Sequence, residues 1–362
     1  MTTDAYAADR VADLLETLVN TASVTGNEAA IADWIADRMR GEAGGELIRS
    51  GNSVVWKPVP SQPTRPMIVL AGHTDTVPAQ GNERARREDG KLYGLGATDM
   101  KGGDAVMLSL FDTLDPAQLR FDVAYVFYDA EEGPSANNGL KRLLHEMQWL
   151  RSASLAILLE PTDLKLELGC NGVLNAEVTV RGKSAHSARP WTGINAVERA
   201  ATWLAGITRF ESRPVQFAGA EFVETLQVTT LRAGRARNII PDELVANLNY
   251  RFTPDRTLAE AERTLRALVP PEFECNIVDA AAPGKACGDH PEVQAFVRRF
   301  GAKVAGKQGW TDVAQFTAAG VPAFNFGPGI PELCHQAGEY CPIPNLETAC
   351  RWLAAFLSRD SA

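Results

Sequence analysis

Three short apolar runs in this chain are each followed within three residues by ionisable side chains. They are "MIVLAG" before His73 and Asp75, "VAYVFY" before Glu131 and Glu132, and "LAILL" before Glu160. Runs of this length and composition are typical of strands that are buried on both faces of a parallel sheet. In an open α/β sheet, ligands bind at the carboxyl ends of such strands. The runs therefore predict an α/β fold with a site at one edge of its sheet.

Helical and strand patterns alternate through the first half of the chain and return near its carboxyl end, which is typical of an α/β domain with a mostly parallel sheet. The sequence pattern changes after about residue 172. There "GVLNAEVTV" and "ELVANLNYRF" alternate apolar and polar residues, as half-buried antiparallel strands do. We predict a catalytic domain from residues 1–172 and 284–362, interrupted by a two-layer α+β domain at 173–283 with two helices and about four strands.

The predicted elements follow from these periodicities. In the outer domain, helices are expected near 5–20, 27–41, 102–114, 138–148 and 345–358, and strands near 52–57, 67–72, 121–128 and 154–159. In the inserted domain, helices are expected near 193–209 and 258–268.

Composition excludes several classes of protein. The chain has 362 residues, 45% of them hydrophobic, which is enough for the cores of two domains. A net charge of −9 without a basic tract argues against nucleic acid and membrane surfaces as partners. The apolar runs are far shorter than the roughly 20 residues that span a bilayer, and the first 20 residues are typical of an amphipathic helix, not of a signal peptide. Six cysteines without a C-x-x-C pair suggest reduced thiols, so a cytoplasmic protein is expected.

Each ionisable residue at the strand ends has an ordinary structural explanation when it is taken alone. A histidine there is more often hydrogen-bonded than metal-bound, and an aspartate before a helix is most often an N-cap. Acidic residues beside glycine and proline usually mark a solvated turn. Asp99 in "LYGLGATDMKGG" and His335 in "ELCHQAGEYCP" extend the set, which then holds two of the five histidines. Several carboxylates buried at one sheet edge would each cost several kcal/mol without a cation, so a metal site is expected.

Spacing suggests different roles for these side chains. His73 and Asp75 are two residues apart in extended chain, so they share a face and the aspartate can orient the imidazole. The adjacent Glu131 and Glu132 are expected to diverge, so that one binds metal and the other acts as a base. Two divalent cations carry four positive charges, which three carboxylates and a hydroxide nearly balance. Two metals about 3.5–4 Å apart activate water and stabilise the oxyanion of amide hydrolysis.

The motifs "GHTDTVP", "GLGATDMKGG", "DAEEG" and "LEPT", with the late His335, resemble those of the dinuclear zinc amidohydrolases. That family includes succinyl-diaminopimelate desuccinylase, acetylornithine deacetylase, aminoacylase and the glutamate carboxypeptidases such as carboxypeptidase G. The segments "VTVRGKSAHSARPWTGINAVERA", "RNIIPDELVANLNYRF", "GWTDVAQF" and "PAFNFGPG" are most similar to the actinobacterial type of desuccinylase. The resemblance extends over essentially the whole chain.

This resemblance implies a set of metal ligands. His73 and Glu160 would bind one zinc ion, Glu132 and His335 the other, and Asp99 would bridge the two. Each ion then has three protein ligands and an open position, as catalytic zinc requires. Two divalent ions, zinc or cobalt, are therefore the expected cofactors.

The same resemblance implies three catalytic roles and a homodimer. Asp75 would orient His73, and Glu131 would be the general base. His186, in "RGKSAHSARP", would donate a hydrogen bond to the oxyanion, usually in the active site of the partner subunit. The inserted domain would then act as a lid and as the dimerisation surface.

Four further residues match positions that hold the polar ends of the substrate in this family. They are Asn238, Arg251 and Thr311, with Arg189 as an additional contact. Arginine recognises carboxylates in a bidentate manner, which suits a dicarboxylate substrate on an acidic protein. Arg251 on an alternating strand could also simply face solvent.

Three functions are compatible with the sequence. The first is hydrolysis of an N-acyl amino acid, with N-succinyl-LL-2,6-diaminopimelate of lysine biosynthesis as the leading substrate. The second keeps the site but acts on N-acetylornithine, another N-acyl amino acid or a small peptide. The third is a metal-dependent binding protein without chemistry, which the presence of Glu131 disfavours because binding alone needs no base.

Overall fold

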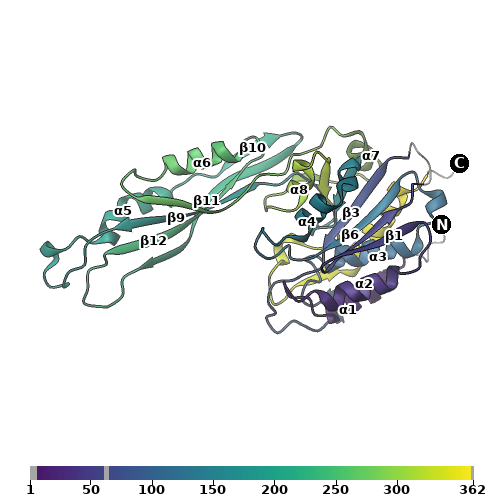
Figure 1. Cartoon of the computed structure of the whole chain (residues 1–362), viewed down its shortest axis with the longest axis horizontal. Coiled ribbons are helices and arrows are strands. Elements are labelled where there is room, and N and C mark those ends of the chain that lie inside the picture. Colours follow the sequence, from purple (N-terminus) through teal and green to yellow (C-terminus); the bar gives the residue numbers. More distant parts are fainter. Residues whose placement is uncertain (1–5, 61–64, 360–362) are drawn as a thin grey trace. The chain divides into compact units, whose positions relative to one another are not determined.

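The computed structural model describes residues 6–60 and 65–359, which divide into two compact units (Figure 1). Of the described residues, the first unit is built from 6–60, 65–168, 287–305 and 315–359. The second is built from residues 169–286 and 306–314, so the chain leaves the first unit and returns to it. Within the described residues, the strands form sheets of eight, five and three strands.

The eight-stranded sheet of the first unit has the order β1-β2-β6-β3-β7-β15-β8-β14. Its central strands β6, β3, β7 and β15 are parallel, as predicted. Next to them, β2 pairs antiparallel with β6, and β8 pairs antiparallel with β15. Strands β1 and β2 are joined by the two-residue turn Gly51–Asn52, and such a hairpin can only pair antiparallel. The strands are β1 (Gly45–Ser50), β2 (Ser53–Pro58), β3 (Met67–His73), β6 (Asp122–Tyr128), β7 (Leu155–Leu158), β8 (Leu166–Leu168), β14 (Val304–Gly306) and β15 (Ala323–Asn325).

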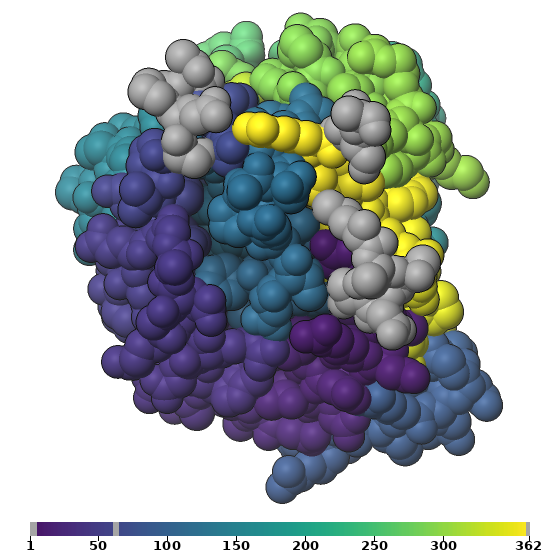
Figure 2. All heavy atoms as spheres, turned by 90° about the vertical axis from the view of Figure 1, so that its right-hand side faces the viewer, coloured from purple at the N-terminus to yellow at the C-terminus, as the bar shows by residue number. Residues whose placement is uncertain are grey.

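Helices form the second layer of the first unit. Helix α3 packs on β3 and β6, and α1 and α9 pack on α3. The space-filling view shows purple amino-terminal and yellow carboxyl-terminal segments on one face (Figure 2). The start of the helix expected near residue 5 lies outside the described residues, and the described helix begins at Ala8. The helices outside the five-stranded sheet are α1 (Ala8–Asn20), α2 (Ala29–Met39), α3 (Lys101–Thr113), α4 (Gly139–Glu146), α7 (Pro291–Phe300), α8 (Val313–Ala318) and α9 (Ile343–Leu357).

The central strands are apolar because both of their faces are covered. Every residue of β6 is buried, and so is every residue of β3 after Met67. Such strands have no solvent-exposed face on which a polar residue could alternate, so their sequences are nearly continuous apolar runs. Apart from Asp122 at the start of β6, the charged and imidazole side chains appear where these strands end, and this places the candidate site at the carboxyl edge of the sheet.

A glycine brings α3 against that edge. A Cβ atom on Gly103 would lie 2.2 Å from the carbonyl oxygen of Leu159, so only glycine permits this approach of helix to strand backbone. Leu159 precedes Glu160, and α3 begins two residues after Asp99. The close packing therefore brings the Asp99 loop to the end of β7.

The second unit is one antiparallel sheet with two helices. The strand order is β10-β11-β12-β9-β13; α5 packs on β9, β11 and β12, and α6 packs on β9 and β13. The sheet has five strands, one more than the alternating pattern suggested, because β10 pairs with β11 through a turn at Ala218–Gly219. Its elements are β9 (Gly172–Arg181), α5 (Ala196–Ile207), β10 (Arg213–Phe217), β11 (Ala220–Ala233), β12 (Glu243–Phe252), α6 (Leu258–Ala267) and β13 (Glu274–Ala281).

A small three-stranded sheet joins the carboxyl-terminal part of the first unit to the segment before Asp99. It joins β4 (Arg86–Glu88), β5 (Lys91–Tyr93) and β16 (Tyr340–Pro342), with β5 in the middle. This pairing holds the segment after His335 beside the segment that precedes Asp99. In residues 6–60 and 65–359, no helix has the length and apolarity required to cross a membrane.

Candidate metal centre and active site

The predicted ligands of the first unit converge at the carboxyl edge of its sheet. His73 is the last residue of β3 and pairs in register with Tyr128, the last residue of β6. Glu132 follows β6 by four residues, and Glu160 follows β7 by two. The side chains come together because neighbouring parallel strands end at the same edge.

Asp99 lies between two groups of potential ligands. One group is His73, Asp99 and Glu160, and the other is Asp99, Glu132 and His335; within each group the ligand atoms lie within 4.8 Å of one another. Asp99 Oδ1 is 3.2 Å from His73 Nε2, and Asp99 Oδ2 is 3.4 Å from His335 Nε2. His335 Nε2 is also 2.8 Å from Glu132 Oε1. The two oxygens of one carboxylate therefore face two different imidazoles, as a bridging ligand requires.

Asp75 connects the end of β3 to the loop after β6. Its carboxylate accepts hydrogen bonds from the backbone N–H groups of Glu131 (2.9 Å) and Glu132 (3.0 Å) and from the hydroxyl of Thr25 (2.9 Å). Its Oδ1 also lies 3.6 Å from His73 Nδ1, on the ring edge opposite the nitrogen that faces Asp99. Asp75 therefore orients both the imidazole and the loop that carries the paired glutamates.

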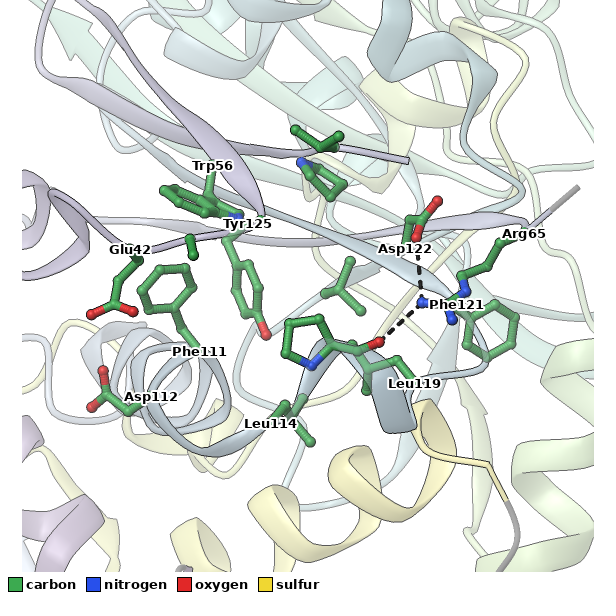
Figure 3. Close-up of a pocket in the computed structure, with 16 residues that line it drawn as sticks. Glu42, Trp56, Arg65, Phe111, Asp112, Leu114, Leu119, Phe121, Asp122 and Tyr125 are labelled. Atoms are coloured by element: carbon green, nitrogen blue, oxygen red, sulfur yellow. Dashed lines mark hydrogen bonds and ion pairs between the residues drawn. The ribbon is translucent and has the colours of Figure 1, made fainter. Parts of the chain in front are cut away.

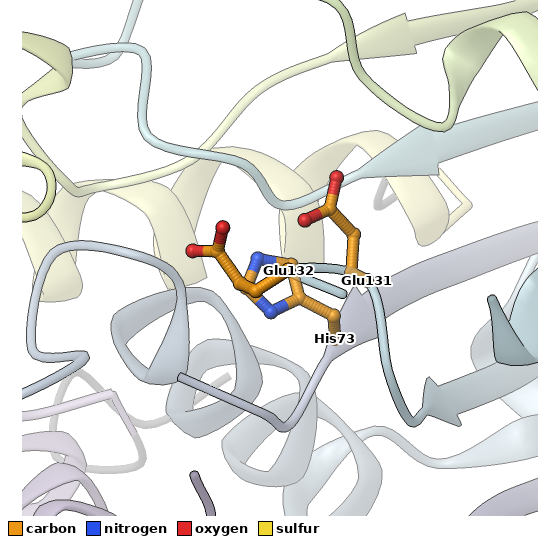
Figure 4. Close-up of side chains that lie close together, drawn as sticks. All are labelled: His73, Glu131 and Glu132. Carbon is orange, nitrogen blue, oxygen red and sulfur yellow. The ribbon is translucent and has the colours of Figure 1, made fainter. Parts of the chain in front are cut away.

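The paired glutamates differ from the sequence expectation in one respect. Instead of diverging, Glu131 and Glu132 each place a carboxylate oxygen within 4.8 Å of the other and of a His73 ring nitrogen (Figure 4). The reason is the backbone: Ala130 adopts a left-handed conformation with φ of 57°, and Asp75 binds both of the following N–H groups. The curled loop turns both carboxylates toward the centre.

The buried charges change the pKa values of the site. Burial by itself would lower the pKa of His73, but hydrogen bonds to Asp75 and Asp99 raise it well above its ordinary value. Hydrogen bonds to Asp99 and Glu132 raise the pKa of His335 to about 10. Burial opposes ionisation of Asp99, yet its bonds to His335 and His73 hold its pKa below the usual range.

These donors fit two zinc ions. Imidazole nitrogens and carboxylate oxygens are ordinary zinc ligands, and each group offers three of them. His73 is 1% exposed and Glu160 is 5% exposed. A divalent ion bound to these two residues would therefore contact ligands that folding has already removed from water. His73, Asp99 and Glu160 would hold one ion, and Asp99, Glu132 and His335 the other.

We expect zinc uptake to release protons. Hydrogen bonds raise the pKa of His335 to about 10 and that of His73 above its ordinary value, so at pH 7 His335 carries a proton that zinc must displace. About one proton should leave His335, any proton on His73 adds to this number, and zinc affinity should rise as the pH is raised. Calorimetric titration in buffers of different ionisation enthalpy measures this number.

A matched pair of variants checks the source of these protons. His335→Ala should release about one proton fewer, whereas His145→Ala, which removes an exposed histidine on α4, should leave the count unchanged. Zinc binding without proton release would contradict the assignment of the two imidazoles.

Three predicted residues of the second unit lie on exposed, neighbouring loops. His186 forms an antiparallel bridge with Ile239, and the N–H of Ser187 donates to the carbonyl of Asn238 (3.0 Å). Arg189 follows in the same turn, with its N–H donating to the carbonyl of His186 (2.8 Å). The structure therefore brings His186, Arg189 and Asn238 together within the second unit.

Arg251 and Thr311 lie in the same unit but in different surroundings. Arg251 is half-buried on β12, where its Nε donates to Asn249 Oδ1 (3.1 Å) and burial lowers its pKa. Thr311 is buried, and its carbonyl accepts from the thiol of Cys170 (3.5 Å).

Two buried ionisable residues that the sequence analysis did not single out lie close in the chain to predicted ligands. Glu339 is 2% exposed and binds the backbone of the Asp99 loop. Burial raises its pKa to about 7. Lys101 is also buried, donates to the carbonyls of Leu18 and Thr21 (3.0 Å each) at the end of α1, and has its pKa lowered to about 8 by burial. In a sequence, a charged residue beside glycines suggests a surface turn. The sequence pattern therefore did not indicate that Glu339 and Lys101 are buried and bind backbone groups.

Another hollow, of about 270 Å³, lies at the opposite end of β6 and has aromatic walls that include Trp56, Phe111 and Tyr125 (Figure 3). Two of its acidic residues are paired with arginines. Asp122 lies 3.6 Å from Arg65, and Asp112 binds Arg38. The convergent ionisable groups of the first unit thus belong to the other edge of the sheet.

An α/β unit that gathers two histidines and three carboxylates into two metal-binding triads at its strand ends has the architecture of a two-metal hydrolase. The sequence profile of peptidase family M20/M25/M40 matches residues 69–359. The chain belongs to this family.

Relatives and a solved structure extend the comparison. The chain is 40% identical over 348 residues to a Mycobacterium tuberculosis protein provisionally named succinyl-diaminopimelate desuccinylase DapE, covering 95% of this chain and 97% of the relative. It is 37% identical over 354 residues to the succinyl-diaminopimelate desuccinylase of Corynebacterium glutamicum, covering 95% of each. A tripeptidase from Staphylococcus aureus shares the fold, with a TM-score of 0.78, 20% identity and 97% of each chain covered.

Proposed function

We propose that the protein hydrolyses N-succinyl-LL-2,6-diaminopimelate to succinate and LL-2,6-diaminopimelate with two zinc ions. The observation that carries the proposal is the placement of Asp99, whose two carboxylate oxygens face His73 and His335 at 3.2 and 3.4 Å. The substrate is supported by the names of the relatives at 37–40% identity. The free cysteines, including buried Cys170, Cys341 and Cys350, support a location in the reducing cytoplasm.

The residues of the first unit divide the work of amide hydrolysis. Bound zinc would supply Lewis-acid polarisation of the amide carbonyl and lower the pKa of water. Glu131 takes a proton from the attacking water and delivers it to the leaving amine as the C–N bond breaks. Asp75 keeps the Nδ1 edge of His73 turned toward itself, so that Nε2 faces the metals.

The second unit supplies substrate contacts in this proposal. Arg251, with Arg189, would bind the terminal carboxylate of the succinyl group, while Asn238 and Thr311 would bind the amino-acid end. A guanidinium that is partly desolvated gains more from a carboxylate than an exposed one, and Arg251 is half-buried. Diaminopimelate carries a free amino group and a second carboxylate, which simple acyl compounds with uncharged ends lack. These charged groups would allow the site to distinguish the two kinds of substrate.

Comparison of substrates tests the proposal. We expect kcat/KM for N-succinyl-LL-2,6-diaminopimelate to exceed that for N-acetylornithine and for dipeptides by at least about tenfold on the same zinc-loaded preparation. A preference for the acetylated substrate or the peptides would replace the desuccinylase proposal with that of a deacetylase or peptidase. No hydrolysis of any of them would favour a binding protein.

We also propose that a homodimer forms through the second unit and that His186 acts in the active site of the partner. The N–H of Ala188 donates to His186 Nδ1 (3.0 Å), so Nε2 carries the ring proton and can donate to an oxyanion. On the same loop Trp191 is 78% exposed, and large exposed aromatic residues are enriched in interfaces.

Hybrid dimers test this role. Neither His186→Ala nor Glu131→Gln should be active alone, but each hybrid dimer has one site with an intact base and the partner's intact His186. After complete mixing, about a quarter of wild-type activity should return. Subunit exchange is verified by co-purification of differently tagged chains. If exchanged dimers stay inactive, His186 does not act across subunits.

A further inference from the structure

The Glu339 carboxylate holds the backbone of the loop that carries Asp99. Its Oε1 accepts hydrogen bonds from the N–H groups of Thr98 (2.9 Å) and Asp99 (3.0 Å), and its Oε2 accepts one from Gly96 (3.1 Å). The side chain is 2% exposed, so these bonds form away from water, where they are strongest. Three donors of one short loop thus share one carboxyl group.

Other contacts join the same two segments. The N–H of Ile330 donates to the Thr98 hydroxyl (2.7 Å), and the N–H of Gly94 donates to the Glu339 carbonyl (3.2 Å). A Cβ on Gly329 would lie 2.2 Å from the carbonyl oxygen of Thr98, so the two backbones approach as closely as glycine allows. The segment 329–339 carries His335, so this packing sets where His335 lies relative to Asp99.

We propose that Glu339 is a positioning residue, which fixes the Asp99 carboxylate between His73 and His335 without itself touching metal or substrate. This inference rests on the proposed function, because it takes Asp99 as the ligand shared by the two metals. A carboxylate suits the role because both of its oxygens accept hydrogen bonds. The amide of glutamine would turn an NH₂ group toward either Gly96 or the Thr98 and Asp99 pair, and donor would then face donor.

Glu339→Gln tests the proposal, with Glu332→Gln as its matched control on the same segment. Glu332 is exposed, so its substitution removes the same charge without touching the Asp99 loop. Glu339→Gln should weaken zinc binding by about 10–100-fold, the usual effect of losing a partner of a metal ligand, and Glu332→Gln should leave it unchanged. Competition with a chromogenic chelator measures the affinity, and the visible spectrum of the cobalt-loaded protein reports the ligand geometry.

A merely structural role of Glu339 would give a different result. Leu353→Ala removes a fully buried side chain of α9 and serves as a destabilised reference with an intact Asp99 loop. If Glu339→Gln lowers the melting temperature as Leu353→Ala does but keeps wild-type zinc affinity and cobalt spectrum, the proposal is overturned. If Glu339→Gln does not fold, Glu339→Asp keeps the charge but withdraws the carboxylate by one methylene, and it should show the same loss of affinity.

The outcomes separate this inference from the proposed function. Wild-type protein that binds two zinc ions and hydrolyses the succinylated substrate, together with Glu339→Gln that binds zinc equally well, overturns only the role of Glu339. Wild-type protein that binds no pair of zinc ions overturns both. Wild-type protein that binds two zinc ions but prefers another substrate leaves the metal measurements on Glu339 valid as a test.

Discussion

Glu131→Gln should lower kcat by about 10²–10⁴-fold while the zinc content of the protein stays unchanged. The glutamine side chain has the same size as that of glutamate, and the backbone N–H of residue 131 still donates to Asp75. The side-chain amide, however, cannot accept the proton of the attacking water. Because the loss concerns the chemical step, KM should change little. Steady-state kinetics on the succinylated substrate and elemental analysis of the same sample measure the two quantities.

The neighbouring glutamate is the control for this result. Glu132 lies 2.8 Å from His335 and belongs to a ligand group, so Glu132→Gln should lose zinc from that group together with activity. The two variants change adjacent residues of one loop, and only their zinc contents should separate them. If Glu131→Gln keeps near wild-type kcat, Glu131 is not the base.

Asp99→Asn should remove both metals and with them essentially all hydrolysis. Asp99 belongs to both ligand groups, and the neutral amide offers one acceptor oxygen where two are needed. Because two metal ions supply several kcal/mol of transition-state stabilisation, we expect kcat/KM to fall by about 10³-fold or more. Elemental analysis after dialysis against a weak chelator gives the zinc content per chain.

Glu160→Gln tests whether Asp99 differs from a ligand that binds only one metal ion. Glu160 belongs to one ligand group only, so this variant should keep the zinc bound by Glu132 and His335. Equal zinc loss from Asp99→Asn and Glu160→Gln would argue against a bridge, and full retention of zinc by Asp99→Asn would exclude Asp99 as a ligand.

The sequence by itself determined the strand ends and the types of ligand found there. β3, β6 and β7 are buried on both faces, so their apolar runs stop where the backbone leaves the sheet, and His73 and Glu160 mark those stops. Parallel strands end at a common edge, and charge balance then points to metal ions. These inferences need only local periodicity and elementary electrostatics.

The antiparallel outer strands and the geometry of the loops were decided only by the tertiary structure. Glu131 and Glu132 converge instead of diverging because Asp75, 56 and 57 residues earlier in the chain, binds their N–H groups. Glu339 reaches the N–H of Asp99 across 240 residues of sequence. No short pattern encodes such bonds, because an acidic residue beside glycine has the same local signature whether it faces water or a buried backbone. The fold decides between the two by what it packs against the carboxylate.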